Sequence, residues 1–343
     1  MSGVLVLLVV IVVAAIVVLR AVHLVRRRAV LPGRLLPPPG SPSSMEAAAL
    51  LAALRRRGGA AVIAVAAVVL LCLAVQAVWP SGGGLPIVLA PALALLVLTG
   101  THAVWPLPDE PAPTASTRTH ADITTRRAGG FGPSWGYSLP ALLMAATLAS
   151  VIVAGLVATP DEAGRSREYG YAIAASALPG EVGPASGTTG PFPGWYYGIP
   201  VIVVLLVSAL LLGWALHRNA RRPRLRGAGL VAFDDAVRTC VGFALAAGAG
   251  TLLALQLAVL GLMAGPALLN AARNIPGAAV SEGGGMAGAD VPTLWAGVAV
   301  LVLALVLLGV VAVLGATFMS WILGQRRSPA GQPGRLQPGG AHR

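Results

Sequence analysis

The sequence predicts an all-α fold, a polytopic bundle of seven transmembrane helices with the N-terminus outside the cell and the C-terminus in the cytoplasm. Apolar residues make up 56% of the 343 residues and charged residues only 10%, and the mean hydropathy is +0.81. Seven apolar runs are long enough to cross about 30 Å of hydrocarbon as helices, and arginines gather between alternate runs. This composition lies outside the range of soluble domains and indicates a multi-pass protein of the plasma membrane.

The first apolar run, Val4 to Leu19, predicts a transmembrane helix within residues 1–25. Arg20 and the group Arg26 to Arg28 follow it, and no charged side chain precedes it, which is the reverse of the charge order of a signal peptide. We therefore expect an uncleaved helix whose basic flank lies in the cytoplasm. Residues 26–58 are predicted to form a basic, proline-rich linker, in which residues 43–57 form either a short interfacial helix or an extension of the second span.

Six further runs predict a six-helix bundle over residues 59–323. The runs pair into three hairpins, 59–105, 139–217 and 237–323, with two long external loops, 159–198 and 266–293. Residues 324–343 are expected to form a disordered basic tail in the cytoplasm. The six spans themselves are Ala60 to Trp79, Leu85 to Trp105, Leu139 to Ala158, Ile199 to His217, Val237 to Gly265 and Leu294 to Leu323.

The distribution of arginine tests this arrangement, because only the first helix was used to set the orientation. Of the 24 basic residues, all of them arginine, 21 lie in segments that alternation places in the cytoplasm. An even number of spans would put several of these clusters on the wrong side of the membrane. Topology thus accounts for the net charge of +12. We expect contacts with the lipid bilayer, and with anionic lipid headgroups at the Arg-rich face, and none with nucleic acid.

The predicted spans carry few polar side chains that are suited to chemistry. The middle of each span lacks Asp, Glu and Arg, which are the usual markers of proton relays and ion pathways. The candidates that remain are Gln76, His102 and Gln256. His102 has no acidic or cysteine partner on its span, so a hydrogen-bonded or interfacial histidine is the favoured interpretation. We expect no catalytic residue, no cofactor and no metal site.

Two segments outside the spans hold the other candidate functional residues. Trp195, Tyr196 and Tyr197 come just before the fifth span, where they either make specific contacts or only anchor the helix at the interface. In the central cytoplasmic loop, Asp234 and Asp235 lie in the segment AFDDAVR. Acidic residues contribute nothing to orientation, so these two suggest a specific role. Asp234 and Arg238 are spaced for an i,i+4 pair at the start of a helix.

Four stretches of the chain also carry a resemblance to known proteins. They are THADITTRR before the fourth span, TPDEAGRSREYGYA in the first long external loop, and RRPRLR and AFDDAVR in the central cytoplasmic loop. Through them, roughly from Ala121 to Val241, the chain resembles a group of uncharacterised actinobacterial integral membrane proteins. The resemblance implies a multi-pass membrane protein and brings no function with it.

The sequence therefore favours a non-catalytic subunit or scaffold of a membrane assembly, with other membrane proteins as partners. The alternative is a transporter or permease for a weakly polar or lipid-like substrate. Such a protein requires Gln76 and Gln256 to face a shared cavity, which gives the alternative a structural test.

Overall fold

The computed structural model describes residues 42–105, 134–173, 185–222, 230–274 and 291–324. The predicted first helix and residues 325–343 of the predicted tail lie outside these ranges. Within them, six helices are long and apolar enough to cross a membrane. This agrees with the six spans predicted after the first one.

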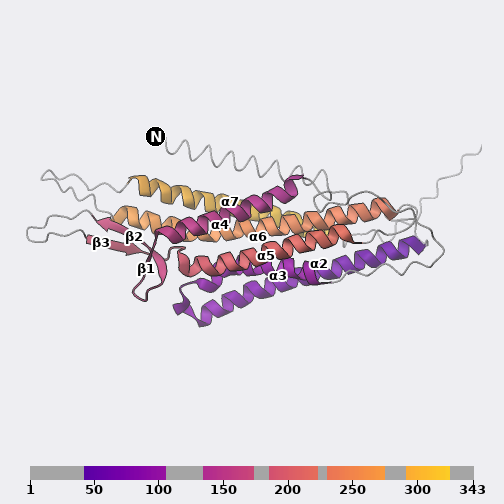
Figure 1. Ribbon diagram of the computed structural model, residues 1–343, viewed down its shortest axis with the longest axis horizontal. Coiled ribbons are helices and arrows are strands. Elements are labelled where there is room, and N and C mark those ends of the chain that lie inside the picture. Colours follow the sequence, from indigo (N-terminus) through magenta and orange to yellow (C-terminus); the bar gives the residue numbers. More distant parts are fainter. Residues whose placement is uncertain (1–41, 106–133, 174–184, 223–229, 275–290, 325–343) are drawn as a thin grey trace, which may run out of the picture.

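The six helices run side by side in an elongated bundle (Figure 1). Helix α3 packs against α2, α5 and α6, whereas α6 also packs against α4 and α7, so α3 and α6 form the centre. A short 3-10 helix, η2 (Pro80–Gly82), joins the first two helices. The helices are α2 (Pro42–Val78), α3 (Leu85–Val104), α4 (Ser134–Val157), α5 (Trp195–Arg221), α6 (Leu230–Asn274) and α7 (Val291–Gly324).

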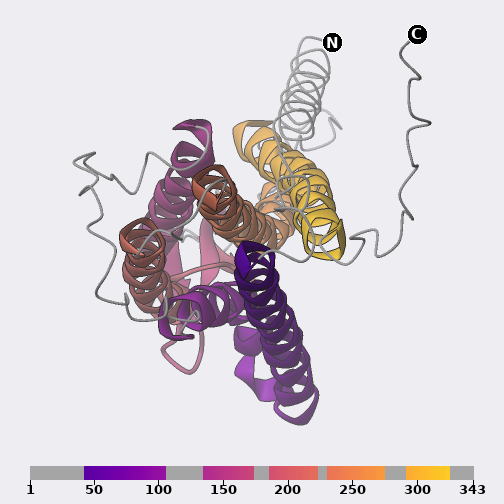
Figure 2. The same cartoon turned by 90° about the vertical axis from the view of Figure 1, so that its right-hand side faces the viewer.

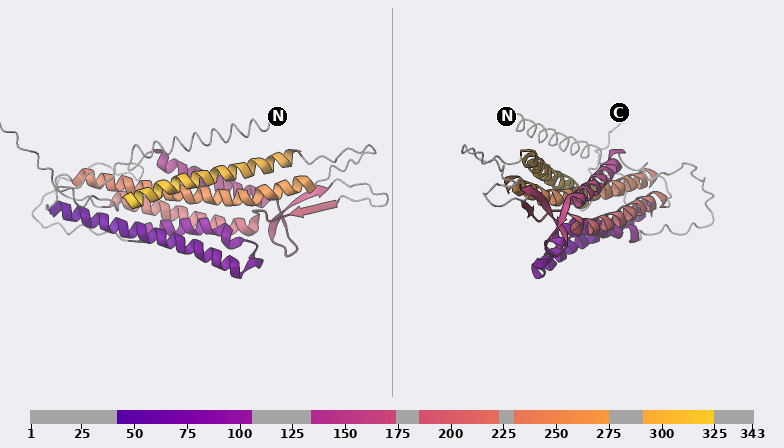
Figure 3. Two further views of the ribbon diagram at one scale, coloured as in Figure 1. Left: turned by 180° about the vertical axis from the view of Figure 1, so that it is seen from behind. Right: turned by 60° about the vertical axis from the view of Figure 1, so that its left-hand side comes forward.

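The bundle has two chemically different ends, which lie at opposite extremes of its long axis (Figures 1 and 3). The Arg-rich end contains the start of α2 and α6 and the end of α3 and α5, with Arg55 to Arg57 and Arg218 among its side chains. The sheet end contains the α2–α3 turn, a small β-sheet and the end of α6.

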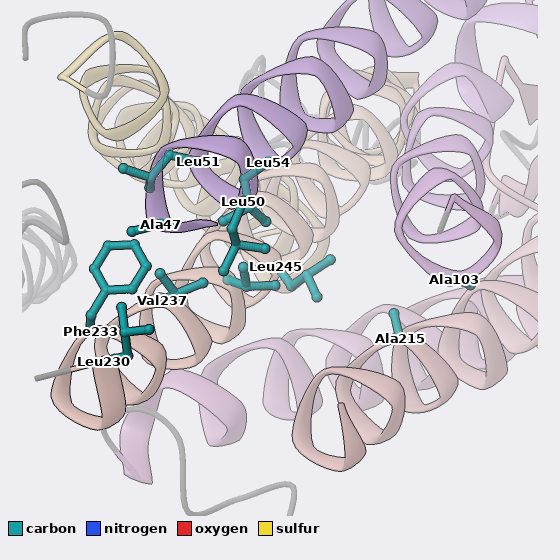
Figure 4. Packing of buried hydrophobic residues seen from close by; sticks show 11 residues of the cluster. Ala47, Leu50, Leu51, Leu54, Ala103, Ala215, Leu230, Phe233, Val237 and Leu245 are labelled. Carbon is teal, nitrogen blue, oxygen red and sulfur yellow. The ribbon is translucent and has the colours of Figure 1, made fainter. Parts of the chain in front are cut away.

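Helix α2 is continuous from Pro42 to Val78 and passes through Gly58 and Gly59 without a break. Residues 43–57 therefore extend the second span, which is the second of the two predicted alternatives. Four apolar side chains on this extension (Ala47, Leu50, Leu51 and Leu54) are buried in a cluster with Leu230, Phe233 and Val237 at the start of α6 (Figure 4). Burial of this face explains why the helix continues through two glycines that favour a stop.

The C-terminal half of α2 is much less covered than this extension. Seen from the Arg-rich end, α2 leans away from the other helices as it runs toward the α2–α3 turn (Figure 2). Leu70, Leu71 and Val78 are exposed, and in a membrane these apolar side chains would contact lipid.

Helix α6 is 45 residues long, so it measures about 68 Å at 1.5 Å per residue and exceeds the hydrocarbon core about twofold. Its start joins the apolar cluster with α2, and its end packs against the sheet. The helix is longer at both ends than the predicted span, Val237 to Gly265, because contacts with elements distant in sequence stabilise its two extensions. Close contacts with α7 occur at Gly261, where a Cβ would lie 2.9 Å from the Cβ of Ala304.

A three-stranded antiparallel sheet follows α4 directly, in the order β1, β2, β3. The strands are β1 (Ala158–Pro160), β2 (Ser166–Ile173) and β3 (Ala185–Thr189). Gly164, with φ of 75°, completes the turn between β1 and β2, in a conformation that favours glycine. The prediction of an all-α fold was wrong here, because the sheet occupies part of the predicted loop over 159–198. Apolar and polar residues alternate only weakly over β2, where Tyr169 and Tyr171 flank Gly170, so the sequence pattern predicted no strand.

Candidate functional sites at the two ends of the bundle

At the Arg-rich end, Asp234 and Arg238 form an ion pair from which water is excluded. Both side chains are fully buried, and the Arg238 guanidinium lies 2.8 Å from Asp234 Oδ2. The two residues are four apart on α6, so one face of the helix presents both. The other carboxylate oxygen, Asp234 Oδ1, accepts a hydrogen bond from Arg222. One carboxylate is thus shared between two guanidinium groups, so the three side chains together keep one net positive charge.

Arg238 also caps the C-terminal end of α5. Its Nη1 donates to the carbonyl oxygens of Asn219 and Ala220, at 3.1 and 2.8 Å, and its Nη2 donates to that of Arg222 at 2.7 Å. The last carbonyls of a helix have no partner within the helix and carry partial negative charge. In the other direction, Asn219 Nδ2 donates to the carbonyl oxygen of Arg238 at 3.0 Å.

These contacts lock the end of α5 to the start of α6. Removing one member of a buried ion pair costs about 3–5 kcal/mol, because the other member keeps its desolvation penalty. The sequence predicted the Asp234 and Arg238 pair from its spacing, but it gave no indication of Asn219 and Arg222, which lie at the C-terminal end of α5 and just after it. Asp235 is half-buried beside this network.

The C-terminal end of α3 is capped in the same way, by Arg218 of α5. Its Nη1 donates to the carbonyl oxygen of Ala103 at 2.7 Å and to that of Val104 at 3.3 Å. His102, in the last turn of α3, is buried, and its Nδ1 lies 2.9 Å from the carbonyl oxygen of Leu98. The histidine is thus hydrogen-bonded within its own helix.

At the sheet end, two tyrosines at the start of α5 hold the α2–α3 turn. Tyr196 donates its hydroxyl to the carbonyl oxygen of Gly82 at 3.1 Å, and Tyr197 donates to that of Gly83. Tyr197 is fully buried. The predicted aromatic group therefore makes specific contacts between segments that are more than a hundred residues apart, in addition to any role at the membrane interface.

Asp161 organises the turn between β1 and β2. Its Oδ1 accepts the backbone N–H groups of Ala163 and Arg165, at 2.9 and 2.8 Å. Its Oδ2 forms ion pairs with the side chains of Arg165 and Arg167. The guanidinium groups of both arginines also lie over the ring of Tyr196, at 5.6 and 6.0 Å from its centroid, within the range of cation–π attraction.

The ionisation of Asp161 follows from these contacts. Burial opposes the charged form, but the hydrogen bonds from the Arg165 backbone and from the Arg167 and Arg165 side chains outweigh it, and they lower the pKa of Asp161 from 3.8 to about 2. A carboxyl group whose pKa is depressed by folding stabilises the fold above its unfolded pKa. That contribution is lost as the pH falls from about 4 through about 2.

Trp195, the first residue of the predicted aromatic group, packs against α4 at Gly155. A Cβ on Gly155 would lie 2.6 Å from the Trp195 ring, and a Cβ on Gly198 would lie 2.8 Å from Val151 Cγ1. The crossing of α4 and α5 therefore requires the absence of a side chain at both glycines.

An apolar pocket of about 300 Å³ lies beneath the sheet, between α4, α6 and α7. Tyr169 of β2 and Phe192 line it next to the sheet, with their ring centroids 5.3 Å apart. Val153, Val157 and Leu303 line it and are also exposed. Because these side chains lie on spanning helices, the pocket would open sideways into the hydrocarbon of the membrane. Its volume falls at the lower end of the range of small-molecule sites.

The two predicted amide candidates do not line this pocket. Gln256 is fully buried, and its Nε2 donates to the carbonyl oxygen of Val88 at 3.0 Å, in the turn of α3 that Pro91 interrupts. The Oε1 atoms of Gln76 and Gln256 are both covered and accept no hydrogen bond from the described residues. The two amides therefore do not bind each other.

Within the described residues, no group of three or more His, Cys, Asp or Glu side chains could hold a metal ion. Comparison of the chain with models of protein families, with curated proteins and with solved structures found no match in any of the three.

Proposed function

We propose that the protein is a non-catalytic subunit or scaffold of a larger assembly in the plasma membrane. In this proposal the sheet end lies outside the cell and the Arg-rich end lies in the cytoplasm, as the excess of arginine at that end favours. The first predicted helix, if it spans the membrane, brings the number of spans to seven and leaves the N-terminus outside.

The observation that carries the proposal is the attachment of the sheet to the bundle. Asp161, in the turn after β1, binds Arg167 of β2. Arg167 lies over the ring of Tyr196, and Tyr196 donates a hydrogen bond to the carbonyl oxygen of Gly82. The sheet is thereby fixed to α5 and to the α2–α3 turn. A fixed sheet loses little conformational entropy when another protein binds it, whereas an unattached loop of the same length would lose more.

Site-specific photo-cross-linking tests this role. A photoreactive amino acid at Glu162, which is exposed in the turn between β1 and β2, should cross-link a second protein in cells that express the chain at its native level. The matched control places the same group at Arg56, which is exposed at the Arg-rich end. Mild-detergent purification should yield a complex larger than the monomer. A monomer alone, or cross-links only from position 56, would refute the proposal.

A transporter for a lipid-like substrate is the second candidate. The apolar pocket favours it in place of the expected cavity shared by Gln76 and Gln256, because neither amide lines the pocket. Its opening toward the hydrocarbon would admit an acyl chain from the side. If the pocket is part of a transport path, Ala154→Phe, which fills it, should abolish transfer of a fluorescent lipid across liposomes that contain the protein. Ala141→Phe, at an exposed position of the same helix, should leave it unchanged. Absence of any transfer by the unmodified protein would exclude this candidate.

A further inference from the structure

Three consecutive arginines of α2 differ in their surroundings in a way that topology does not explain. Arg56 is exposed, whereas Arg57 is only 6% exposed. Orientation in a membrane requires positive charge near the end of a span, but it does not require that charge to be buried. Burial of a guanidinium group is unfavourable unless hydrogen bonds and an opposite charge compensate it.

No described residue supplies that compensation to Arg57. Within the described ranges, its guanidinium takes part in no ion pair and no hydrogen bond. Arg218 and Arg222 of α5 lie close enough for their charges to repel it. Helix α3 packs against both α2 and α5, and Ala103 at its end belongs to the same apolar cluster as Leu54 of α2 and Ala215 of α5. Figure 4 shows Leu54, Ala103 and Ala215 at this end of the bundle.

The two neighbouring arginines are only partly engaged. Arg218 donates through Nη1 to carbonyl oxygens at the end of α3, and it is exposed. Arg222 donates through Nη2 to Asp234, while its Nη1 is buried and has no partner among the described residues. The nearest described carboxylate, Asp234, is already shared between Arg222 and Arg238. This corner of the bundle thus carries excess positive charge and unused N–H donors.

We propose that Arg57, Arg218 and Arg222 form a binding site for the phosphate group of an anionic phospholipid. The planar guanidinium group matches the oxygen atoms of a phosphate with two parallel hydrogen bonds. Exposed Arg218 provides the entrance, and buried Arg57 provides the inner contact. The site lies at the end of membrane-spanning helices, at the depth where lipid headgroups meet protein. This inference does not depend on the scaffold role proposed above.

Lipid binding to reconstituted protein tests the site. The full chain is placed in phosphatidylcholine nanodiscs with and without phosphatidylglycerol, and retained lipid is measured by native mass spectrometry. Arg57→Gln should weaken phosphatidylglycerol binding about tenfold or more, the effect of losing charge-assisted hydrogen bonds. Arg56→Gln, which removes the same charge one residue away, should bind like the unmodified protein. Equal losses in the two variants, or no loss in Arg57→Gln, would overturn the proposal.

A second variant at position 57 and a comparison with free phosphate complete the test of the lipid site. If Arg57→Gln does not fold, Arg57→Leu takes its place with the same expected loss, because it leaves no polar group buried. Inorganic phosphate is added separately to protein in phosphatidylcholine discs, and thermal stability is recorded. Stabilisation by free phosphate, without any by phosphatidylglycerol, would refute a lipid site. Stabilisation by phosphatidylglycerol that Arg57→Gln abolishes supports it.

Discussion

Replacement of Arg238 by leucine should open the Arg-rich end of the bundle. The substitution removes one ion pair with Asp234 and three hydrogen bonds to carbonyl oxygens at the end of α5. Loss of one member of a buried pair costs about 3–5 kcal/mol. Because Arg222 still neutralises Asp234, we expect the lower value, about 3 kcal/mol. The population in which α5 and α6 separate at this end should then rise by on the order of a hundredfold.

The thiol of Cys240 provides the assay. It lies on α6 two residues after Arg238 and is only 7% exposed, so it should react with a maleimide only when this end opens. In Arg238→Leu the labelling rate of Cys240 should rise by about the same factor as the open population, provided that reclosing is faster than labelling. Cys72 on α2 is also buried, and it should react at an unchanged rate because it lies far from the network.

Arg221→Leu is the matched control. Arg221 is one residue from Arg222 on α5, but it is exposed and makes no hydrogen bond or ion pair within the described residues. It should leave the labelling of Cys240 unchanged. The reasoning is refuted if Arg238→Leu also leaves the rate unchanged, or if the two variants accelerate it equally.

Three further outcomes are expected from single substitutions. Asp161→Asn should lower the stability of the sheet end at neutral pH. The difference in stability from the unmodified protein should vanish between about pH 4 and pH 2, where the native carboxyl takes up a proton. A difference in stability that persists at the lower pH would contradict the assigned role. Gly155→Val should cost about 1–3 kcal/mol by overpacking against Trp195, measured by denaturation in detergent. Gln256→Leu should change the free energy of unfolding by no more than about 1 kcal/mol, since loss of the hydrogen bond to Val88 is offset by removal of an unpartnered buried oxygen. A larger loss of stability in the same denaturation assay would show that this amide does more than pack.

The apolar runs predicted the positions of the six described helices. Backbone N–H and C=O groups without hydrogen-bond partners are costly in lipid, and a helix pairs all of them within one segment. Their ends were less predictable. Helix α6 continues past Gly265 to Asn274, and α2 begins at Pro42. In both cases the extension is stabilised by contacts with elements distant in sequence, which periodicity along one segment does not reveal.

The candidate sites were predicted in part. The pairing of Asp234 with Arg238 was predicted correctly because the two residues lie one helical turn apart. The capping of α5 by Arg238 was not predictable, because it depends on how two helices pack. The buried position of Arg57 was missed for the same reason, since its neighbours Arg55 and Arg56 made all three look like an orientation signal. The sheet was missed because short, glycine-containing strands have weak sequence patterns.

Cysteine accessibility in whole cells tests the membrane arrangement on which the account depends. The two native cysteines are replaced by serine, and a single cysteine is introduced either as Glu162→Cys at the sheet end or as Arg56→Cys at the Arg-rich end. A membrane-impermeant maleimide should label position 162 in intact cells and position 56 only after permeabilisation. Labelling of position 56 from outside, with position 162 protected, would contradict the proposed orientation. It would also place the phosphate site on the opposite face of the membrane.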